Sequence, residues 1–137
     1  KTIEKDDDIV QISPYADEPR RPKAARQIAW ERNFTSATRK ARRLRKQLLV
    51  DVCTDWSGPC LMMQQRSFSD AEIVALSDKY VCLRLDGDKE VAFVDDLQIQ
   101  NYPTLLVLDN RGKEIARQVG YQPATELALF LQQHVKE

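Results

Sequence analysis

The chain has 137 residues, of which 42% are hydrophobic and 31% charged, and its formal net charge is zero. That length and composition predict one globular domain with a buried core. The sequence argues against a disulfide-rich scaffold, because it has only three cysteines, and against a membrane span, because no apolar run approaches the roughly 18 residues that a span needs.

The zero net charge conceals a separation of charge along the sequence. Residues 1–19 carry six acidic residues and two lysines, residues 20–46 carry eleven Lys or Arg and one Glu, and residues 47–137 carry fourteen acidic and eight basic residues. The basic segment 39–46 predicts either a solvated helix face or a contact with an acidic partner. Nucleic acid is disfavoured as that partner, because no aromatic residues are interleaved with the basic ones.

The first 25 residues differ in composition from the rest of the chain. They carry three prolines among dense charge, which predicts an extended, mobile N-terminal arm ahead of a domain over residues 26–137, with residues 9–12 as a candidate short strand. The N-terminus is acidic and lacks the apolar segment of a signal peptide. Since the chain begins with Lys1, this observation leaves the compartment open.

The ordered part is expected to begin with a short strand at Ile28 and Trp30, whose neighbours are polar. Apolar residues recur at helical spacing over residues 37–44, which predicts a helix with Thr35 or Ser36 as its N-cap. The run 48–53 is almost continuously apolar and therefore predicts a strand that is covered on both faces.

The remaining elements alternate between helices and strands. Pro59 suits the first turn of a helix and Asp70 suits the N-cap of the next one. Strands are predicted over 80–85, 105–108 and 114–119, and helices over 91–97 and 124–135, with a turn at residues 110–112. Early strands separated by helices favour parallel pairing, and the late hairpin adds an antiparallel edge. The predicted fold is α/β, with a central mixed β-sheet flanked by helices.

The segment 50–60, Val-Asp-Val-Cys-Thr-Asp-Trp-Ser-Gly-Pro-Cys, resembles the thioredoxin active-site segment, in which Trp-Cys-Gly-Pro-Cys follows a buried strand. Three further matches follow in order: Phe68-Ser69-Asp70, Tyr102-Pro103-Thr104 and Gly120. The resemblance covers residues 28–136 and is strongest to the thioredoxin-like domain of thiol:disulfide interchange proteins. It implies a thioredoxin-like fold and thiol–disulfide oxidoreductase chemistry without a cofactor, and it favours an extracytoplasmic over a cytoplasmic location.

One cysteine of the family motif is replaced. The attacking cysteine of the family corresponds to Ser57, whose hydroxyl neither ionises at such a site nor forms a disulfide, and the resolving cysteine corresponds to Cys60. The ordinary two-thiol cycle therefore cannot run through Ser57 and Cys60. The chain is expected to be inactive or to work with a single thiol, so that Ser57→Cys would create reductase activity.

The resemblance assigns roles to the other matching residues. Asp51 corresponds to the buried carboxylate beneath the resolving cysteine, and the alternative is a solvated aspartate at the end of a strand. Trp56 corresponds to the aromatic residue that shields the site, unless it only contributes packing. The substrate groove would also include Gly58, Pro59, Tyr102 and Pro103, with Pro103 in the cis conformation and the Tyr102 backbone pairing with an extended peptide.

Cys53 departs from the family, which commonly has an aromatic residue there. Residues two apart on a strand share a face, so Cys53 lies on the face of Asp51, toward the helix that carries Cys60. A Cys53–Cys60 disulfide is conceivable, but a buried free thiol at each position is the favoured expectation. Cys82 is expected to be a core residue. The only histidine, His134, is expected at the surface or at a helix end, and the cysteine spacing fits no zinc site.

Two functions from different classes follow. The first is a thiol–disulfide oxidoreductase or interchange domain that acts on a polypeptide or protein disulfide, or exchanges electrons with a redox partner protein. The second is a redox-inactive module that binds polypeptide or a partner protein through the groove at Trp56, Tyr102 and Pro103.

Overall fold

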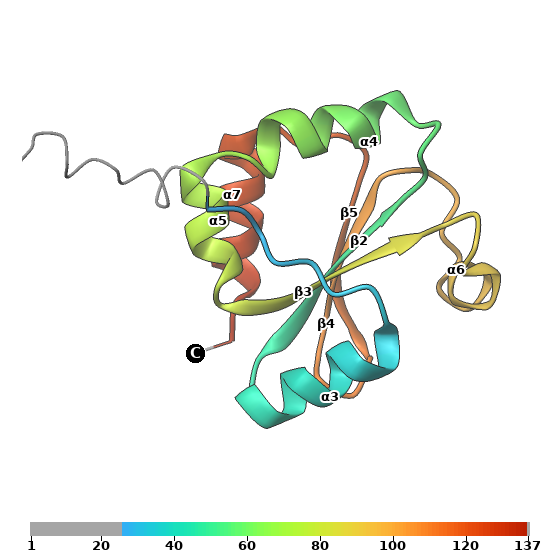
Figure 1. The fold of residues 1–137 in the computed structure, drawn as a ribbon, viewed down its shortest axis with the longest axis vertical. Coiled ribbons are helices and arrows are strands. Elements are labelled where there is room, and N and C mark those ends of the chain that lie inside the picture. The colour runs from blue at the N-terminus through green and yellow to red at the C-terminus, as the bar shows by residue number, and fades with distance from the viewer. Residues whose placement is uncertain (1–25, 137) are drawn as a thin grey trace, which may run out of the picture.

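A computed structural model describes residues 26–136, so the predicted arm and its short strand lie outside the described residues and stay predictions. Four strands of this part form one mixed sheet in the order β3-β2-β4-β5 (Figure 1). β2 (Gln47–Cys53) and β3 (Tyr80–Asp86) pair in parallel. β4 (Thr104–Leu108) runs antiparallel to both β2 and β5 (Glu114–Val119). The predicted α/β fold with a mixed sheet is confirmed.

Helices cover both faces of the sheet. α3 (Phe34–Leu44) and α6 (Val91–Leu97) pack on one face, whereas α5 (Ala71–Ser77) and α7 (Ala124–His134) pack on the other (Figure 1). α4 (Gly58–Met62) follows β2 and continues directly into a π-helical turn (Met63–Ser67). Every residue of β2 is buried, because this strand is central and covered on both sides, which explains its apolar run.

Side-chain alternation along the strands decides which residues meet at the site. Leu48, Val50 and Val52 point toward α3 and α6 and belong to one core cluster. Leu49 belongs to the opposite cluster, beneath α5 and α7, and Asp51 and Cys53 share its face. Asp51 and Cys53, near the end of β2, therefore point to the face of the sheet on which α4 begins.

Two local predictions before β2 were wrong. Asn33, not Thr35 or Ser36, is the N-cap of α3, and its side-chain oxygen accepts a 2.8 Å hydrogen bond from the Ser36 backbone N–H. The helix begins earlier than predicted because Phe34 already packs against Phe93 of α6. The strand expected at Ile28 and Trp30 is reduced to one isolated bridge between Glu31 and Leu83.

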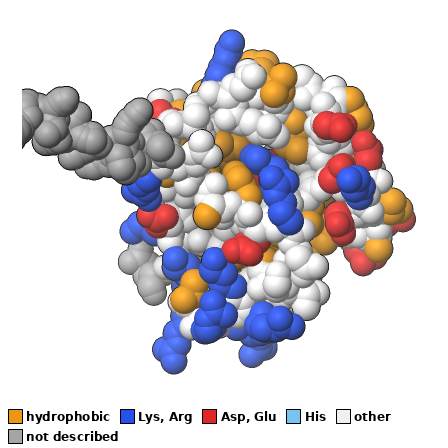
Figure 2. Space-filling view, in the orientation of Figure 1, with side chains coloured by type: hydrophobic (Ala, Val, Ile, Leu, Met, Phe, Trp, Pro, Cys, Tyr) orange, Lys and Arg blue, Asp and Glu red, His pale blue; other side chains and the backbone are white. Residues whose placement is uncertain are grey.

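Charge is separated on the surface as it is along the sequence. Lys and Arg side chains gather over α3, while Asp and Glu side chains gather near α6 (Figure 2). Arg39, Arg42 and Arg43 on the outer face of α3 are exposed. The predicted basic face is therefore present, and its acidic partner stays a prediction. Among the described helices, none combines the length and the apolar character needed to cross a bilayer.

Candidate active site

The site is built where β2 ends and α4 begins. Ser57 is the N-cap of α4, and its Oγ accepts a hydrogen bond of 3.2 Å from the Cys60 backbone N–H. Pro59 lies in the first turn, where a missing N–H leaves no helix hydrogen bond unmade. The start of α4 is therefore well stabilised at Ser57, because serine is among the best N-caps.

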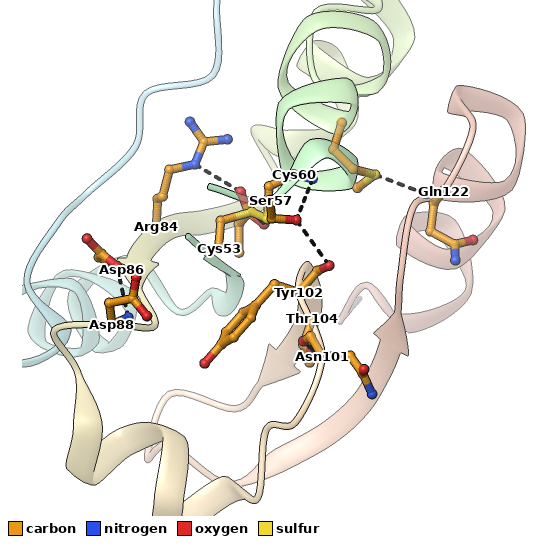
Figure 3. The surroundings of a disulfide bond; sticks show 12 residues. Cys53, Ser57, Cys60, Arg84, Asp86, Asp88, Asn101, Tyr102, Thr104 and Gln122 are labelled. Atoms are coloured by element: carbon orange, nitrogen blue, oxygen red, sulfur yellow. Dashed lines mark hydrogen bonds and ion pairs between the residues drawn. A yellow bond between two sulfur atoms is a disulfide. The ribbon is translucent and has the colours of Figure 1, made fainter. Parts of the chain in front are cut away.

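Cys53 and Cys60 form a disulfide (Figure 3). Their Cα atoms lie 5.8 Å apart, inside the range that disulfide geometry demands. The expectation that both thiols stay free was wrong. The physical reason is that only residues 54–57 separate β2 from α4, so the first turn of the helix lies over the last residue of the strand. Both half-cystines are buried, at 5% and 1% exposure respectively.

A buried ion pair lies under the disulfide. Asp51 is fully buried, and its Oδ2 accepts a 2.9 Å hydrogen bond from Arg84 Nε. Asp51 and Arg84 are cross-strand partners of β2 and β3, so the sheet register brings them together. Burial raises the pKa of Asp51, and the positive charge and hydrogen bond of Arg84 oppose that rise. The alternative of a solvated aspartate is excluded.

Asp51 contacts the sulfur of Cys53, with Oδ1 lying 3.3 Å from Sγ. The carboxylate therefore lies beside the strand cysteine of the pair, whereas the resemblance had placed it under Cys60. In the dithiol form, the Cys53 S–H can donate a hydrogen bond to this oxygen.

The residues predicted to form a substrate groove lie on the loops before β4 and α4. The Tyr102–Pro103 peptide bond is cis, and Ser57 Oγ donates a 3.3 Å hydrogen bond to the Tyr102 carbonyl oxygen. The cis bond agrees with the prediction, and the Tyr102 carbonyl that precedes Pro103 contacts residue 57. The Trp56 side chain is 67% exposed, its ring meets the Tyr102 ring edge to face at 6.0 Å, and its Nε1 donates to Asp88. Gly58 and Pro59 are exposed beside it.

The remaining candidate residues lie apart from this site. Cys82 is buried in β3, and burial raises the pKa of its thiol to about 12, as expected of a core residue. His134 is the last residue of α7, and its ring lies against that of Phe130. Within residues 26–136, no group of three or more His, Cys, Asp and Glu side chains could hold a metal ion.

Sequence reasoning missed Arg84 altogether. Its guanidinium lies 4.2 Å from the centre of the Trp30 ring and 5.6 Å from that of Phe68, so it is stacked as well as ion-paired. The signal was present in the sequence. A lone acid in one buried strand and a lone base in another are expected to pair, because a buried charge without a partner is costly.

The mixed four-stranded sheet with helices on both faces, in this order along the chain, defines a thioredoxin-type domain. The chain belongs to the thioredoxin-like domain family, whose model matches residues 34–134.

Individual relatives agree with this family. The chain is 32% identical over 88 residues to the thioredoxin of Haemophilus influenzae, which covers 64% of this chain and 79% of that protein. It is 29% identical over 89 residues to the thiol:disulfide interchange protein DsbD of Pseudoalteromonas atlantica, covering 61% of this chain but only 15% of that protein.

Solved structures give the same result. The thioredoxin NaTrxh from Nicotiana alata is 29% identical, has a TM-score of 0.58 and covers 75% of this chain and 85% of its own. A thioredoxin from Thermus thermophilus has a TM-score of 0.71 at 18% identity, covering 78% of this chain and 86% of its own, and supports the fold alone.

Proposed function

We propose that the chain is a thiol–disulfide oxidoreductase domain whose redox couple is Cys53 and Cys60. The observation that carries the proposal is the disulfide between these residues at the start of α4. In the family pattern the disulfide would join residues 57 and 60, and here the strand residue Cys53 takes the part that Ser57 cannot perform. The similarity to a thioredoxin and to a thiol:disulfide interchange protein supports the same class of reaction.

Ser57 keeps a structural role in this proposal. Its hydroxyl caps α4 and contacts the Tyr102 carbonyl, so the helix start and its contact with the Tyr102–Pro103 loop form without a thiol there. The expectation of inactivity then applies only to the Ser57–Cys60 pair. Cys53 and Cys60 can still be joined in a disulfide. When this bond forms, the two electrons released reduce the disulfide of a partner.

Asp51 is the proposed proton acceptor for the dithiol form. Thiol–disulfide exchange needs a thiolate, and the Asp51 Oδ1 atom lies within reach of the Cys53 sulfur. The raised pKa of this carboxyl, caused by burial, makes it a stronger base than a solvated aspartate. Arg84 fixes its orientation through the other carboxylate oxygen.

The proposed partners are a polypeptide or protein disulfide, or a redox partner protein. An extended chain would lie across the groove of Trp56, Tyr102 and Pro103. The second candidate function, a redox-inactive module that binds polypeptide, is favoured by one observation: Trp56 exposes a large aromatic surface beside the cis proline.

Two measurements on the full chain test the proposal. Alkylation under denaturing, non-reducing conditions followed by mass spectrometry should label Cys82 alone and give a linked peptide containing Cys53 and Cys60. Reduction of a protein disulfide by the dithiol form should be lost in Cys53→Ala and in Cys60→Ala. Cys82→Ala is the matched control and should retain the activity.

Other outcomes favour the binding module. Three labelled cysteines in protein prepared without a reductant, together with no reductase activity before or after reduction, would overturn the oxidoreductase proposal. Peptide binding that is weakened by Trp56→Ala in such a protein would then support the second candidate.

A further inference from the structure

The two sulfurs of the disulfide differ in their surroundings. Cys60 lies on the side of Ser57, whose side chain is buried between the α4 amides and the Tyr102 carbonyl. Cys53 instead lines a small cavity of about 150 Å³ on the side of Arg84. None of Ser57, Cys60, Tyr102 and Pro103 lines that cavity. Figure 3 shows Arg84 and Tyr102 on different sides of the sulfur atoms.

A larger cavity shares part of the lining of the small one. Arg32, Gln64 and Arg84 line both, and the larger cavity, of about 460 Å³, extends along Trp30 and Phe68. We call the two neighbouring cavities together the Arg84 channel.

Two polar atoms, on residues that line the small cavity, have no hydrogen-bond partner in the described part of the chain. Arg84 Nη2 and Thr54 Oγ1 are buried and make no hydrogen bond within residues 26–136. Thr54 and Arg84 both line the small cavity. Buried donors without partners are uncommon in folded proteins, and a bound ligand is one of the ordinary reasons for them. A carboxylate would satisfy the guanidinium donor with a charge-assisted hydrogen bond.

Charge along the channel is uneven. The larger cavity is lined by Arg32 and Arg84 and by no acidic residue of the described part. The small cavity is also lined by two carboxylates, Asp55 and Asp86, which disfavour an anionic group there. An anionic group is therefore best placed in the larger cavity, with the rest of the ligand directed toward Cys53.

We propose that the Cys53–Cys60 disulfide is opened at Cys53 by a small thiol bearing a carboxylate, which enters through the Arg84 channel and not through the cis-proline groove. This inference rests on the proposed function, because it assumes that the disulfide is a redox couple. It adds the sulfur that is attacked, the route to it and the chemical class of the reductant.

The exchange is balanced by the small thiol alone. A thiolate RS⁻ attacks Cys53 Sγ, an R–S–S–Cys53 bond forms, and the Cys53–Cys60 bond breaks with its electron pair on Cys60. A second RS⁻ attacks the R sulfur of the mixed disulfide and releases Cys53 as a thiolate. Two RSH are thereby oxidised to RSSR, and the protein disulfide gains two electrons and two protons. The reverse reaction reduces RSSR.

The test compares three small thiols on the oxidised full chain. The probes are 3-mercaptopropionate, 2-mercaptoethanol and cysteamine, which carry a negative, zero and positive charge. Each rate of disulfide opening is divided by the rate of the same thiol with a neutral model disulfide at the same pH, which removes differences in thiol reactivity. The normalised rate should be highest for 3-mercaptopropionate and lowest for cysteamine.

Charge reversal identifies the channel. Arg32→Glu should lower the normalised preference for 3-mercaptopropionate over 2-mercaptoethanol by about five-fold, the size of a partly exposed charge interaction. Arg39→Glu on the outer face of α3 makes the same charge change away from the channel and should leave the preference unaltered. Arg84→Lys keeps a positive charge beside Asp51 but lacks the Nη2 donor, and it should also lower the preference for 3-mercaptopropionate.

A trapping experiment identifies the attacked sulfur. The disulfide of 3-mercaptopropionate should form an adduct on Cys53 in Cys60→Ala faster than on Cys60 in Cys53→Ala, as mapped by mass spectrometry. Faster capture at Cys60, or a preference that Arg32→Glu and Arg39→Glu change equally, would overturn the inference while the redox couple stands. Absence of any Cys53–Cys60 disulfide in the oxidised chain would instead overturn the proposed function itself.

Discussion

Reduction of the Cys53–Cys60 disulfide should lower the free energy of unfolding of the domain. The size of the loss is set by the number of residues between the two cysteines. The two residues are separated by seven positions in the sequence, so the bond closes a short loop in the unfolded chain. Loop-closure entropy for about eight residues corresponds to roughly 2.5 kcal/mol at 25 °C. Since the urea dependence for a small domain is about 1–3 kcal/mol per molar, the unfolding midpoint should fall by roughly 0.8–2.5 M.

One interaction in the native dithiol form opposes this loss. The Cys53 S–H can donate to Asp51 Oδ1, which lies 3.3 Å from the sulfur, and hydrogen bonds to charged groups stabilise proteins. The measured difference is therefore expected at or below the loop-closure value.

Urea unfolding followed by tryptophan fluorescence, with and without dithiothreitol, measures the effect. The double variant Cys53→Ala/Cys60→Ala is the control, and its midpoint should not respond to the reductant. If protein with a verified 53–60 link unfolds at the same urea concentration before and after reduction, with an unchanged slope, the loop-closure reasoning is refuted.

Three further changes probe the groups around the disulfide. Asp51→Asn should remove a decline in stability with pH. Burial raises the native pKa of Asp51 above 3.8, so the native state binds the proton more tightly than the unfolded state does. The wild-type free energy of unfolding should therefore fall relative to that of the variant as pH rises from about 4 toward the raised pKa, which urea titrations at several pH values will measure. Ser57→Ala should cost about 1 kcal/mol of unfolding free energy through loss of the α4 N-cap, and an unchanged urea midpoint would argue against that role. Cys82 should resist iodoacetamide at pH 8 in the folded protein and react only after unfolding, since burial raises its thiol pKa to about 12; rapid labelling of the native protein would contradict its place in the core.

The fold could be predicted almost entirely from the sequence because apolar periodicity and turn residues mark each element. The run before Cys53 identified the central strand, and Asp70 identified a helix start that the structure confirms through hydrogen bonds to the backbone of Glu72 and Ile73. The cap at Asn33 was missed because three suitable N-cap residues, Asn33, Thr35 and Ser36, lie within four positions, and tertiary packing of Phe34 decides between them.

The site could be predicted only in part. Alternation along β2 correctly placed Cys53 and Asp51 on one face. It predicts the face to which a side chain points, but not the distance between Cys53 and Cys60. Whether α4 comes within bonding range depends on how tightly the Thr54–Ser57 loop turns, and the sequence does not specify this. The partner of Asp51 depends on the register between β2 and β3, which pairs Asp51 with Arg84 and which the hydrophobic pattern leaves open.

The disulfide also turns the segment from Cys53 to Cys60 into a closed ring, with the exposed Trp56 at its outer side. Such a ring resembles a cyclised peptide, in which fewer conformations have to be surrendered when a partner binds. Opening the ring gives Trp56 more freedom and should weaken that binding. Thermodynamic linkage then requires the converse. A partner that binds the disulfide-closed segment more tightly than the open one makes the disulfide harder to reduce by the same factor. Partner affinity and oxidation state are thereby coupled without any movement of the sheet.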